Sequence, residues 1–316
     1  MRLRTLAPIA ACLTSILALT ACGSSADAEG DGGTEPDTIV FASIPSEDST
    51  SLEQQFANVI EVIEQETGKE VEVQNATDYA AVIEGMRAGK IQIAGFGPFS
   101  YVTAKDSGVN LEPIAAVVDS ADEEPGYRSY AVVPAGSDIT DLAGFAGKNV
   151  CFVDPTSTSG YLYPSAGLLE AGVDPETDVN QVMAGGHDAS ALAVADGQCD
   201  AGFAFDTMVD SVLIKSGQLK EGQLTKIWES EVIPGSPIAI STDTLDADTQ
   251  EQIKTAFTEK INIDALVESG VCEDAENCAL PEESKYGYVA VDDALYDGVR
   301  KVCETTQAAA CQESSS

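Results

Sequence analysis

From residue 38 onward, short apolar runs alternate with segments in which apolar residues recur every three or four positions. The apolar runs are typical of buried strands and cover 38–44, 71–73, 91–96 and 111–119. Helical spacing occurs between them, at Leu52 to Ile63, at Tyr79 to Met86 and over 100–105, with Gly68 and Gly89 as stop signals. This order predicts a mostly parallel sheet that is covered by helices.

The alternation is repeated after residue 129. Strand-like runs cover 130–133, 149–153, 178–184 and 199–205, and helix-like runs cover 139–147, 161–171, 189–196 and 208–215. Extended segments at 224–228 and 233–240 then lead to helices predicted over 245–261 and 294–304. We therefore expect two α/β lobes. Residues 38–128 begin the first lobe, 129–232 form the second, and 233–316 return to the first and end in helices.

The first 21 residues have the features of a secretory signal peptide. Arg2 and Arg4 precede an apolar run that is too short and too interrupted for a membrane span. The run ends in Leu19-Thr20-Ala21-Cys22, which resembles the bacterial lipobox, where the cysteine is lipidated. The alternative is a plain signal peptide with an incidental cysteine. Residues 22–37, rich in Gly, Ser, Asp and Glu, predict a flexible tether. We expect an exported lipoprotein, anchored through Cys22 to the outer face of the cytoplasmic membrane.

Six of the eight cysteines remain when Cys12 and Cys22 are set aside. They are Cys151, Cys199, Cys272, Cys278, Cys303 and Cys311. An even number in an exported chain predicts three disulfides. Cys151 and Cys199 lie in strand-like runs and are predicted to pair, whereas the pairing of the last four stays open. With a single histidine, a Cys/His zinc site is not favoured, and we expect neither a metal nor a cofactor.

The most informative turn joins a predicted strand to a predicted helix and reads Asp154-Pro155-Thr156-Ser157-Thr158-Ser159-Gly160. The first N–H groups of a helix have no partner within the helix, and the helix dipole favours negative charge there. Four consecutive hydroxyl residues at this place suggest an anion site. The alternative is an ordinary N-cap, which needs only one of them.

Other candidate residues lie at the ends of predicted strands, where open α/β sheets place their ligands. His187, the only histidine, follows Gly-Gly in a position that we expect to be exposed; a structural role is the alternative. Tyr79 is expected to be the most exposed residue of its helix face, with core packing as the alternative. Phe96 lies in the turn 95–98 that ends a strand. Asp206 could accept the proton of a protonated oxyanion, which would exclude sulfate, or could cap the helix at Met208.

The formal net charge of −37 argues against nucleic acid as a partner, because phosphate backbones require patches of Lys and Arg. A net charge of this size usually serves to keep a protein soluble. It also has a consequence for an anionic ligand, whose approach the field of the whole protein would oppose. The site would therefore have to attract that ligand locally, through N–H groups, hydroxyls and a few cations.

Four segments resemble, in the same order, the phosphonate-, phosphite- and phosphate-binding proteins of ABC importers. They are 77–86 (Thr-Asp-Tyr-Ala-Ala-Val-Ile-Glu-Gly-Met), 154–160, 184–195 (Ala-Gly-Gly-His-Asp-Ala-Ser-Ala-Leu-Ala-Val-Ala) and 233–238 (Ile-Pro-Gly-Ser-Pro-Ile). The resemblance extends over 38–261. It implies the type II periplasmic-binding-protein fold, in which two α/β lobes, joined by two crossover strands, close on a ligand in a central cleft.

The resemblance also implies roles for single residues. Ser157, Thr158 and Ser159 would hold the phosphonyl oxygens of the ligand. Tyr79 would contact these oxygens from the other lobe, and His187 would contact them from the same lobe. Ser46 matches a position at which members of the family often have Ser or Thr. Two positions depart from its pattern. Phe96 lacks the hydroxyl of the tyrosine in some phosphonate binders. Ser236 replaces the Asp that holds the amine in binders of aminoalkylphosphonates, which argues against 2-aminoethylphosphonate.

The expected function is therefore capture of a small phosphorus oxyanion without an amine (phosphite, phosphate or a simple alkylphosphonate) by a monomer that delivers it to an ABC permease with its ATPase. The chain is not expected to be an enzyme. A secreted hydrolase with a Ser nucleophile and His187 is the enzymatic alternative, but no Gly-x-Ser-x-Gly motif is present. The second alternative is a sensory or adhesion lipoprotein with the same fold.

Overall fold

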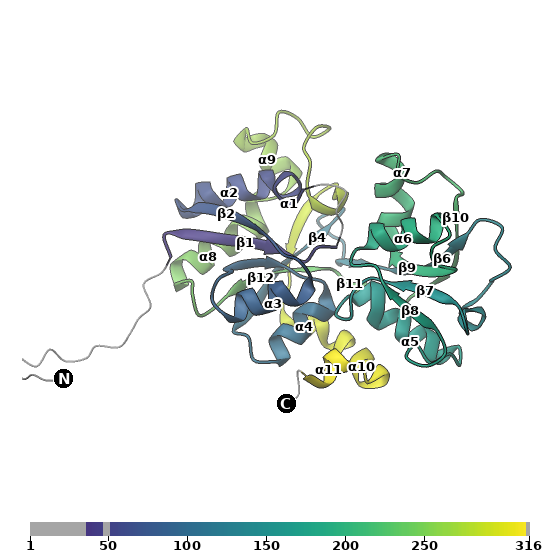
Figure 1. The fold of residues 1–316 in the computed structure, drawn as a ribbon. Helices are drawn as coiled ribbons and strands as arrows, with labels where there is room; N and C mark the ends of the chain where they lie inside the picture. The colour runs from purple at the N-terminus through teal and green to yellow at the C-terminus, as the bar shows by residue number, and fades with distance from the viewer. Residues whose placement is uncertain (1–35, 47–50, 314–316) are drawn as a thin grey trace, which may run out of the picture. The chain divides into compact units, whose positions relative to one another are not determined.

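The computed structural model describes residues 36–46 and 51–313. The predicted signal peptide, Cys22 and nearly all of the predicted tether lie outside these residues. Within the described part, two sheets carry helices on their faces (Figure 1). The helices that cover both sheets are as predicted. The prediction of a mostly parallel sheet is wrong, because strands of both sheets also pair antiparallel with their neighbours and both sheets are mixed.

The first sheet has six strands in the order β13-β4-β12-β3-β1-β2. Their bounds are β1 Thr38–Ser43, β2 Glu70–Asn75, β3 Ile93–Gly95, β4 Leu111–Val118, β12 Pro237–Ser241 and β13 Gly287–Ala290. β1 pairs in parallel with β2 and β3, whereas β12 is antiparallel to β3 and β4, and β13 is antiparallel to β4. Two of the six strands thus come from the chain after the second lobe.

Helices cover both faces of the first sheet. They are α1 Leu52–Gln55, α2 Ala57–Thr67, α8 Ala247–Thr255, η4 Ala256–Lys260 and α9 Ile263–Ser269 on one face, and α3 Tyr79–Arg87 and α4 Pro98–Asp106 on the other. As predicted, Gly68 ends α2, in a left-handed conformation that favours glycine. The helix predicted from Ser100 begins at Pro98, which suits a first helical turn. The helix predicted over 245–261 begins after Asp246 and becomes π-helical at Ala256.

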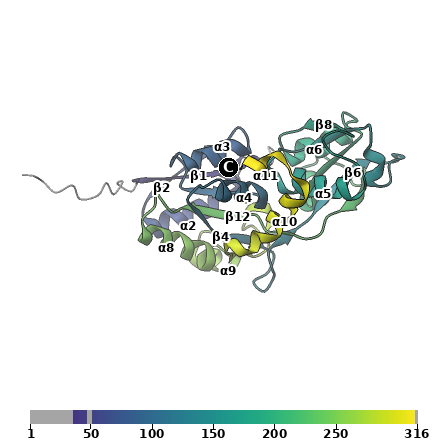
Figure 2. The ribbon, with the colours of Figure 1, turned by 90° about the horizontal axis from the view of Figure 1, so that it is seen from below.

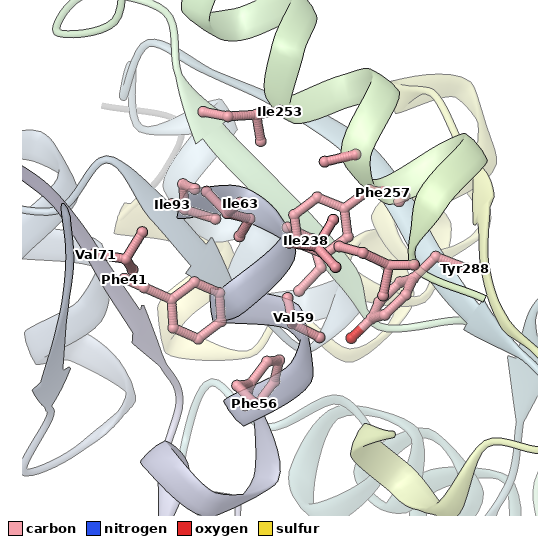
Figure 3. Close-up of a cluster of buried hydrophobic side chains, with 14 of the residues drawn as sticks. Phe41, Phe56, Val59, Ile63, Val71, Ile93, Ile238, Ile253, Phe257 and Tyr288 are labelled. Atoms are coloured by element: carbon pink, nitrogen blue, oxygen red, sulfur yellow. The ribbon is translucent and has the colours of Figure 1, made fainter. Parts of the chain in front are cut away.

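The core of the first lobe is built from both parts of the chain (Figure 3). Phe41 of β1 packs on Phe56 with 4.7 Å between ring centroids, and Phe257 of η4 meets the edge of Tyr288 of β13 at 5.0 Å. Burial of each such side chain stabilises the fold by about 1.5–3 kcal/mol. The late segments are therefore an integral part of the first lobe.

The second sheet has five strands in the order β10-β6-β9-β7-β8. Their bounds are β6 Ser129–Pro134, β7 Asn149–Phe152, β8 Asn180–Met183, β9 Ala201–Phe205 and β10 Leu224–Glu229. The helical elements are η1 Leu142–Phe145, η2 Thr158–Leu162, α5 Tyr163–Glu170, α6 His187–Ala195, η3 Met208–Val212 and α7 Leu213–Lys215. The helix predicted over 139–147 is only the short 3-10 turn η1, which begins after the cap Asp141.

Two short strands join the lobes. β5 Gly126–Tyr127 and β11 Ile233–Pro234 pair antiparallel, with Tyr127 opposite Ile233, and form a sheet of their own between the two larger ones (Figure 1). These are the two crossover strands that the resemblance implies.

The chain ends in η6 Asp293–Tyr296, α10 Asp297–Thr306 and α11 Ala309–Glu313. α10 contacts both α4 of the first lobe and α5 of the second (Figure 2). The hydroxyl of Tyr296 donates to the carbonyl of Gly235, just after β11, at 3.2 Å. The end of the chain is therefore packed beside the connection between the lobes.

The described residues contain three disulfides, Cys151–Cys199, Cys272–Cys278 and Cys303–Cys311. The predicted pair is confirmed, and the last four cysteines pair within short loops. The Cys151–Cys199 bond joins β7 to the segment before β9 and closes 48 residues, which stabilises the fold by about 4 kcal/mol. In the part of the chain that the structure describes, no helix is both long and apolar enough to cross a membrane.

Candidate functional site

A cavity of about 450 Å³ lies between the lobes. All eight predicted site residues line it: Ser46, Tyr79 and Phe96 from the first lobe, and Ser157, Thr158, Ser159, His187 and Asp206 from the second. Several helices begin at this cavity, among them α3, α4, α6 and the continuous stretch of η2 and α5. Since helix N-termini carry partial positive charge and free N–H groups, the cavity is suited to an anion.

The hydroxyl-rich turn both caps a helix and faces the cavity. Ser157 is the N-cap of η2, and its Oγ accepts the N–H of Gly160 at 3.1 Å. The carboxylate of Asp154 fixes the turn, because it accepts the N–H and the hydroxyl of Thr156, both at 2.7 Å. Among the described residues, none accepts the backbone N–H of Thr158 or Ser159. The turn can therefore act both as a helix cap and as an anion site, because the cap uses only the hydroxyl of Ser157.

Thr158 connects the two lobes. Its Oγ1 accepts the N–H of Phe99, in the first turn of α4, at 2.8 Å, and both groups are buried. α4 has no cap from its own N-cap residue, Gly97, so a hydroxyl of the opposite lobe caps it instead. The structure therefore shows the lobes in a closed arrangement around the cavity.

His187 is buried rather than exposed as we expected, with 3% of its surface accessible. Its backbone N–H begins α6 and donates to the carbonyl of Ser46, on the opposite lobe, at 2.8 Å. Its Nδ1 accepts the N–H of Phe205 at 3.2 Å, which places the proton of the neutral ring on Nε2. Nε2 lies 3.4 Å from Ser157 Oγ. Burial lowers the pKa of His187 to about 3, so the ring offers a neutral donor and not a positive charge.

This geometry does not suit a serine nucleophile. In a Ser-His-Asp triad, an acceptor holds the Nδ1 proton so that Nε2 can take the proton of the serine. Here the Nδ1 of His187 is itself an acceptor, occupied by the N–H of Phe205. His187 therefore points a donor, not a base, toward Ser157.

Tyr79 is also buried, at 1% exposure, although we expected it to be the most exposed of its helix face. The buried side-chain polar atoms that have no hydrogen-bond partner within the described residues are Tyr79 Oη, Thr103 Oγ1 and Thr244 Oγ1. Of these three residues, only Tyr79 lines the cavity. Burial raises the pKa of Tyr79 well above its usual value, and the neighbouring side chain of Ser157 offsets this only in part, so the hydroxyl of Tyr79 stays protonated. An unpaired buried donor of this kind is unfavourable unless a further group accepts its hydrogen bond.

Asp206 provides the one carboxylate among the eight residues. Its oxygens accept the N–H groups of Arg128 at 3.0 Å and of Thr207 at 2.9 Å. Burial raises the pKa of Asp206, although these N–H groups oppose that effect. Thr207, the residue before the helix at Met208, makes no side-chain cap bond, and Asp206 accepts the N–H of Thr207 itself. Asp206 thus contributes to the start of this helix as well as to the wall of the cavity.

Ser46 and Phe96 shape the wall on the first lobe. Ser46 contributes its carbonyl, which accepts the N–H of His187. Phe96 is buried, and its N–H donates to the carbonyl of Pro237 at 2.9 Å. The cavity at Phe96 is therefore apolar, as the missing hydroxyl implies.

Sequence reasoning missed Tyr127, which lies on the crossover strand β5 and also lines the cavity. Its ring meets the edge of Phe205 with 6.5 Å between centroids, and Phe205 in turn meets the ring of His187 at 4.8 Å. Burial raises the pKa of Tyr127, and the side chains of Ser159 and Thr158 partly offset this. The only signal was a change in the chain's pattern around Gly126-Tyr127-Arg128-Ser129-Tyr130, which carries no chemistry of its own.

Comparison with known proteins gives a consistent result. The family model of the periplasmic substrate-binding protein of phosphonate ABC transporters matches residues 41–268. The chain is similar to the phosphate-import protein PhnD of Mycolicibacterium smegmatis, with 45% identity over 315 residues and 97% of either chain covered.

Two solved structures also resemble this chain. One is a binding protein component of an ABC phosphonate transporter from Pseudomonas aeruginosa, with a TM-score of 0.74 and 27% identity over 86% of this chain and 87% of that one. The other is PhnD1 from Prochlorococcus marinus in complex with methylphosphonate, with a TM-score of 0.70 and 18% identity over 86% and 98%. The second likeness concerns the fold alone.

Proposed function

The chain belongs to the periplasmic substrate-binding proteins of phosphonate ABC transporters, and from this premise we propose that it captures a small phosphorus oxyanion, with inorganic phosphate the first choice. The type II periplasmic-binding fold agrees with the prediction, as does a role in binding rather than catalysis, since the relatives are solute-binding proteins of importers. Phosphite and methylphosphonate belong to the same proposed class. The relative from Mycolicibacterium smegmatis is a phosphate-import protein, which supports the order of preference.

The observation that carries the proposal is the unpaired hydroxyl of Tyr79 in a cavity that it shares with the Ser157–Ser159 turn. A tetrahedral oxyanion would accept hydrogen bonds from that hydroxyl, from the N–H groups of Thr158 and Ser159 and from Nε2 of His187. Each such charge-assisted bond contributes about 1.5–3 kcal/mol. These donors come from both lobes, so a bound ligand would stabilise the closed arrangement.

Asp206 would select the protonation state of the ligand. A carboxylate repels a fully deprotonated oxyanion but accepts a hydrogen bond from a P–OH group. Phosphate carries such a proton near neutral pH, and the monoanions of phosphite and of alkylphosphonates carry one as well, whereas sulfate does not. Asp206 would therefore reject sulfate while the neutral donors hold the remaining oxygens.

Ser236 supports a ligand without an amine. It lines the cavity in the segment 233–238, where it offers a hydroxyl and no carboxylate. An ammonium group beside Ser236 would meet a hydroxyl instead of a carboxylate, which is a weaker partner for a buried charge. We therefore place 2-aminoethylphosphonate outside the proposed class.

The cellular setting is part of the same proposal. The chain would be exported, lipidated at Cys22 and held as a monomer at the outer face of the cytoplasmic membrane. The closed, loaded form would then deliver the anion to an ABC permease and its ATPase. Labelling with a radioactive fatty acid, lost in a Cys22→Ser variant, tests the lipid anchor.

Calorimetry of the purified protein tests the ligand. Titration with phosphate should give a saturable heat, and titration with sulfate should give none. Absence of heat from phosphate, phosphite and methylphosphonate at millimolar concentrations would contradict the proposal. A heat from sulfate equal to that from phosphate would instead remove the role of Asp206.

A further inference from the structure

A further contact between the lobes is made by residues that line the same cavity and are partly exposed to solvent. Glu283, in the segment before β13, accepts two bonds on its Oε2, from Lys215 Nζ at 2.7 Å and from Ser211 Oγ at 2.5 Å. Glu283 belongs to η5 Pro281–Glu283 of the first lobe, whereas Ser211 and Lys215 belong to η3 and α7 of the second. All three residues line the cavity.

The backbone of this contact is strained. Glu282 and Glu283 have φ angles of +58° and +57°, in the left-handed region that residues other than glycine rarely adopt. The third such residue among the described ones, Gln307, lies at the end of α10. Strained conformations of this kind persist only where surrounding contacts enforce them, and they concentrate at clamps and switches.

Both partners of the contact are attached to elements that position the site. Ser284 Oγ donates to the carbonyl of Val118 at the end of β4 at 2.6 Å, which ties the Glu283 segment to the first sheet. On the other side, Ser211 and Lys215 lie on the helical stretch 208–215 that begins two residues after Asp206. Opening of the lobes would therefore separate Glu283 from both of its donors.

The charges of Glu283 and Lys215 allow their contact to form and to break near neutral pH. Partial burial raises the pKa of Glu283, but the bonds from Lys215 and Ser211 outweigh it, so the pKa lies below its usual value. The Lys215 side chain is 67% exposed and that of Glu283 34%, so water can replace each partner when the contact breaks.

We propose that Glu283, Lys215 and Ser211 form a clasp between the lobes that holds the cavity closed and sets how long the ligand stays bound. This inference rests on the proposed function. The three residues act outside the ligand cage, on the closed arrangement. Their loss should therefore accelerate release and leave association nearly unchanged.

The release rate of radioactive inorganic phosphate, chased with excess unlabelled phosphate, tests the clasp. Glu283→Gln keeps the shape of the side chain but presents an amide where the two donors now meet an oxygen. We expect release about three- to tenfold faster in Glu283→Gln and in Lys215→Gln. The exchanged pair Glu283→Lys with Lys215→Glu should return the rate toward that of the wild type.

The matched control is Glu229→Gln, which breaks the Lys226–Glu229 pair of 2.8 Å within the second lobe. It should release phosphate at the rate of the wild type, and all variants should melt near the wild-type temperature without ligand. Unchanged release in Glu283→Gln, or equal acceleration in Glu229→Gln, would overturn the clasp.

Failure of the proposed function gives a different result. If the wild type binds no phosphate, phosphite or methylphosphonate, the function fails, and small-angle scattering of the ligand-free protein tests the clasp by itself. A larger radius of gyration in Glu283→Gln than in the wild type then supports the clasp. Identical scattering curves overturn it.

Discussion

Tyr79 and His187 each contribute a donor that burial keeps uncharged. Burial lowers the pKa of His187 to about 3, because the charged ring would lose its hydration inside the protein, and this holds although the net charge of the chain is −37. The N–H of Phe205 also occupies the nitrogen that a second proton would need. Uncharged donors in fixed positions can form hydrogen bonds to an oxyanion of the right geometry. They exert no general attraction on other anions that enter the cavity.

Removal of the Tyr79 hydroxyl should separate binding from folding. Tyr79→Phe loses one bond to the proposed ligand, so the affinity for phosphate should fall about 10- to 100-fold, equivalent to about 1.5–3 kcal/mol. Stability without ligand should stay the same or rise, because an unpaired buried donor is removed. Calorimetry and thermal melting measure the two effects.

Tyr101→Phe is the matched control for this experiment. Its hydroxyl is likewise part of a mostly buried ring but donates to Asp293 at 2.6 Å, outside the cavity lining. Affinity should be unchanged there while stability falls. Full affinity in Tyr79→Phe would exclude Tyr79 from the site.

His187 should give the free energy of unfolding a specific dependence on pH. The unfolded chain binds a proton below its pKa of 6.5, whereas the folded chain does not until about pH 3. The contribution of neutral His187 is therefore complete above pH 6.5 and declines as the pH falls toward 3. Between about pH 7 and about pH 5.5, the loss should be about 1 kcal/mol.

Urea unfolding of the wild type and of His187→Gln at both pH values measures this difference. Because the chain has one histidine, the variant should lack this loss, and the carboxylates affect both proteins alike. An equal decline in both proteins would show that His187 is not the titrating group.

At the scale of elements, the sequence pattern predicted most of the strands, because hydrophobic period and glycine stops are local properties. It also identified the turn Ser157–Ser159, because four hydroxyl residues before a helix exceed what a cap needs. It did not predict β13 or the antiparallel pairing, which depend on partners far away along the chain. It could not show that Thr158 caps α4, since Phe99 lies 59 residues away. The burial of Tyr79 and His187 was missed for the same reason, because the opposite lobe covers them.

Other parts of the site had no pattern to reveal them. Tyr127 lies on a strand of two residues, which is too short for any periodicity. Glu283 follows a segment rich in Cys, Glu and Asp, and its left-handed backbone is favoured by glycine, not by glutamate. A left-handed backbone at glutamate contradicts the local conformational preference of that residue. It can therefore be recognised in the tertiary structure but not from the sequence.

The cap that Thr158 provides should act on closure and not on folding. Thr158→Val keeps the shape but leaves the N–H of Phe99 without its acceptor in the closed form, which costs about 1 kcal/mol or more. Phosphate affinity should fall about five- to tenfold, whereas melting of the ligand-free protein should change little. Calorimetry and melting curves provide both measurements.

Asp141→Ala is the control within one lobe. Asp141 caps η1 by accepting the N–H of Gly144 at 3.1 Å. Its loss should lower the melting temperature and leave affinity unchanged. The same pattern in Thr158→Val would mean that the bond to Phe99 stabilises folding instead of closure.

At the scale of the whole molecule, an anion is proposed to bind to a protein of charge −37. The two lysines that line the cavity, Lys215 and Lys285, are each paired with a carboxylate, Glu283 and Asp119. The donors of the cage act only at hydrogen-bond distance, whereas the net charge acts over the Debye length, about 8 Å at physiological ionic strength. Attraction is therefore local and repulsion is long-range.

This opposition predicts an unusual effect of salt on association. Added potassium chloride screens the repulsion, so the rate at which phosphate associates should rise severalfold between about 0.01 M and about 0.15 M salt. Stopped-flow or filter-binding measurements give the rate.

Glu123 and Glu124, which are exposed and line the cavity, test whether carboxylates near the cavity cause the repulsion. Glu123→Gln with Glu124→Gln should associate faster at low salt and respond less to added salt. A rate that falls with salt in the wild type would mean that cations attract the ligand from a distance, and the local mechanism would be wrong.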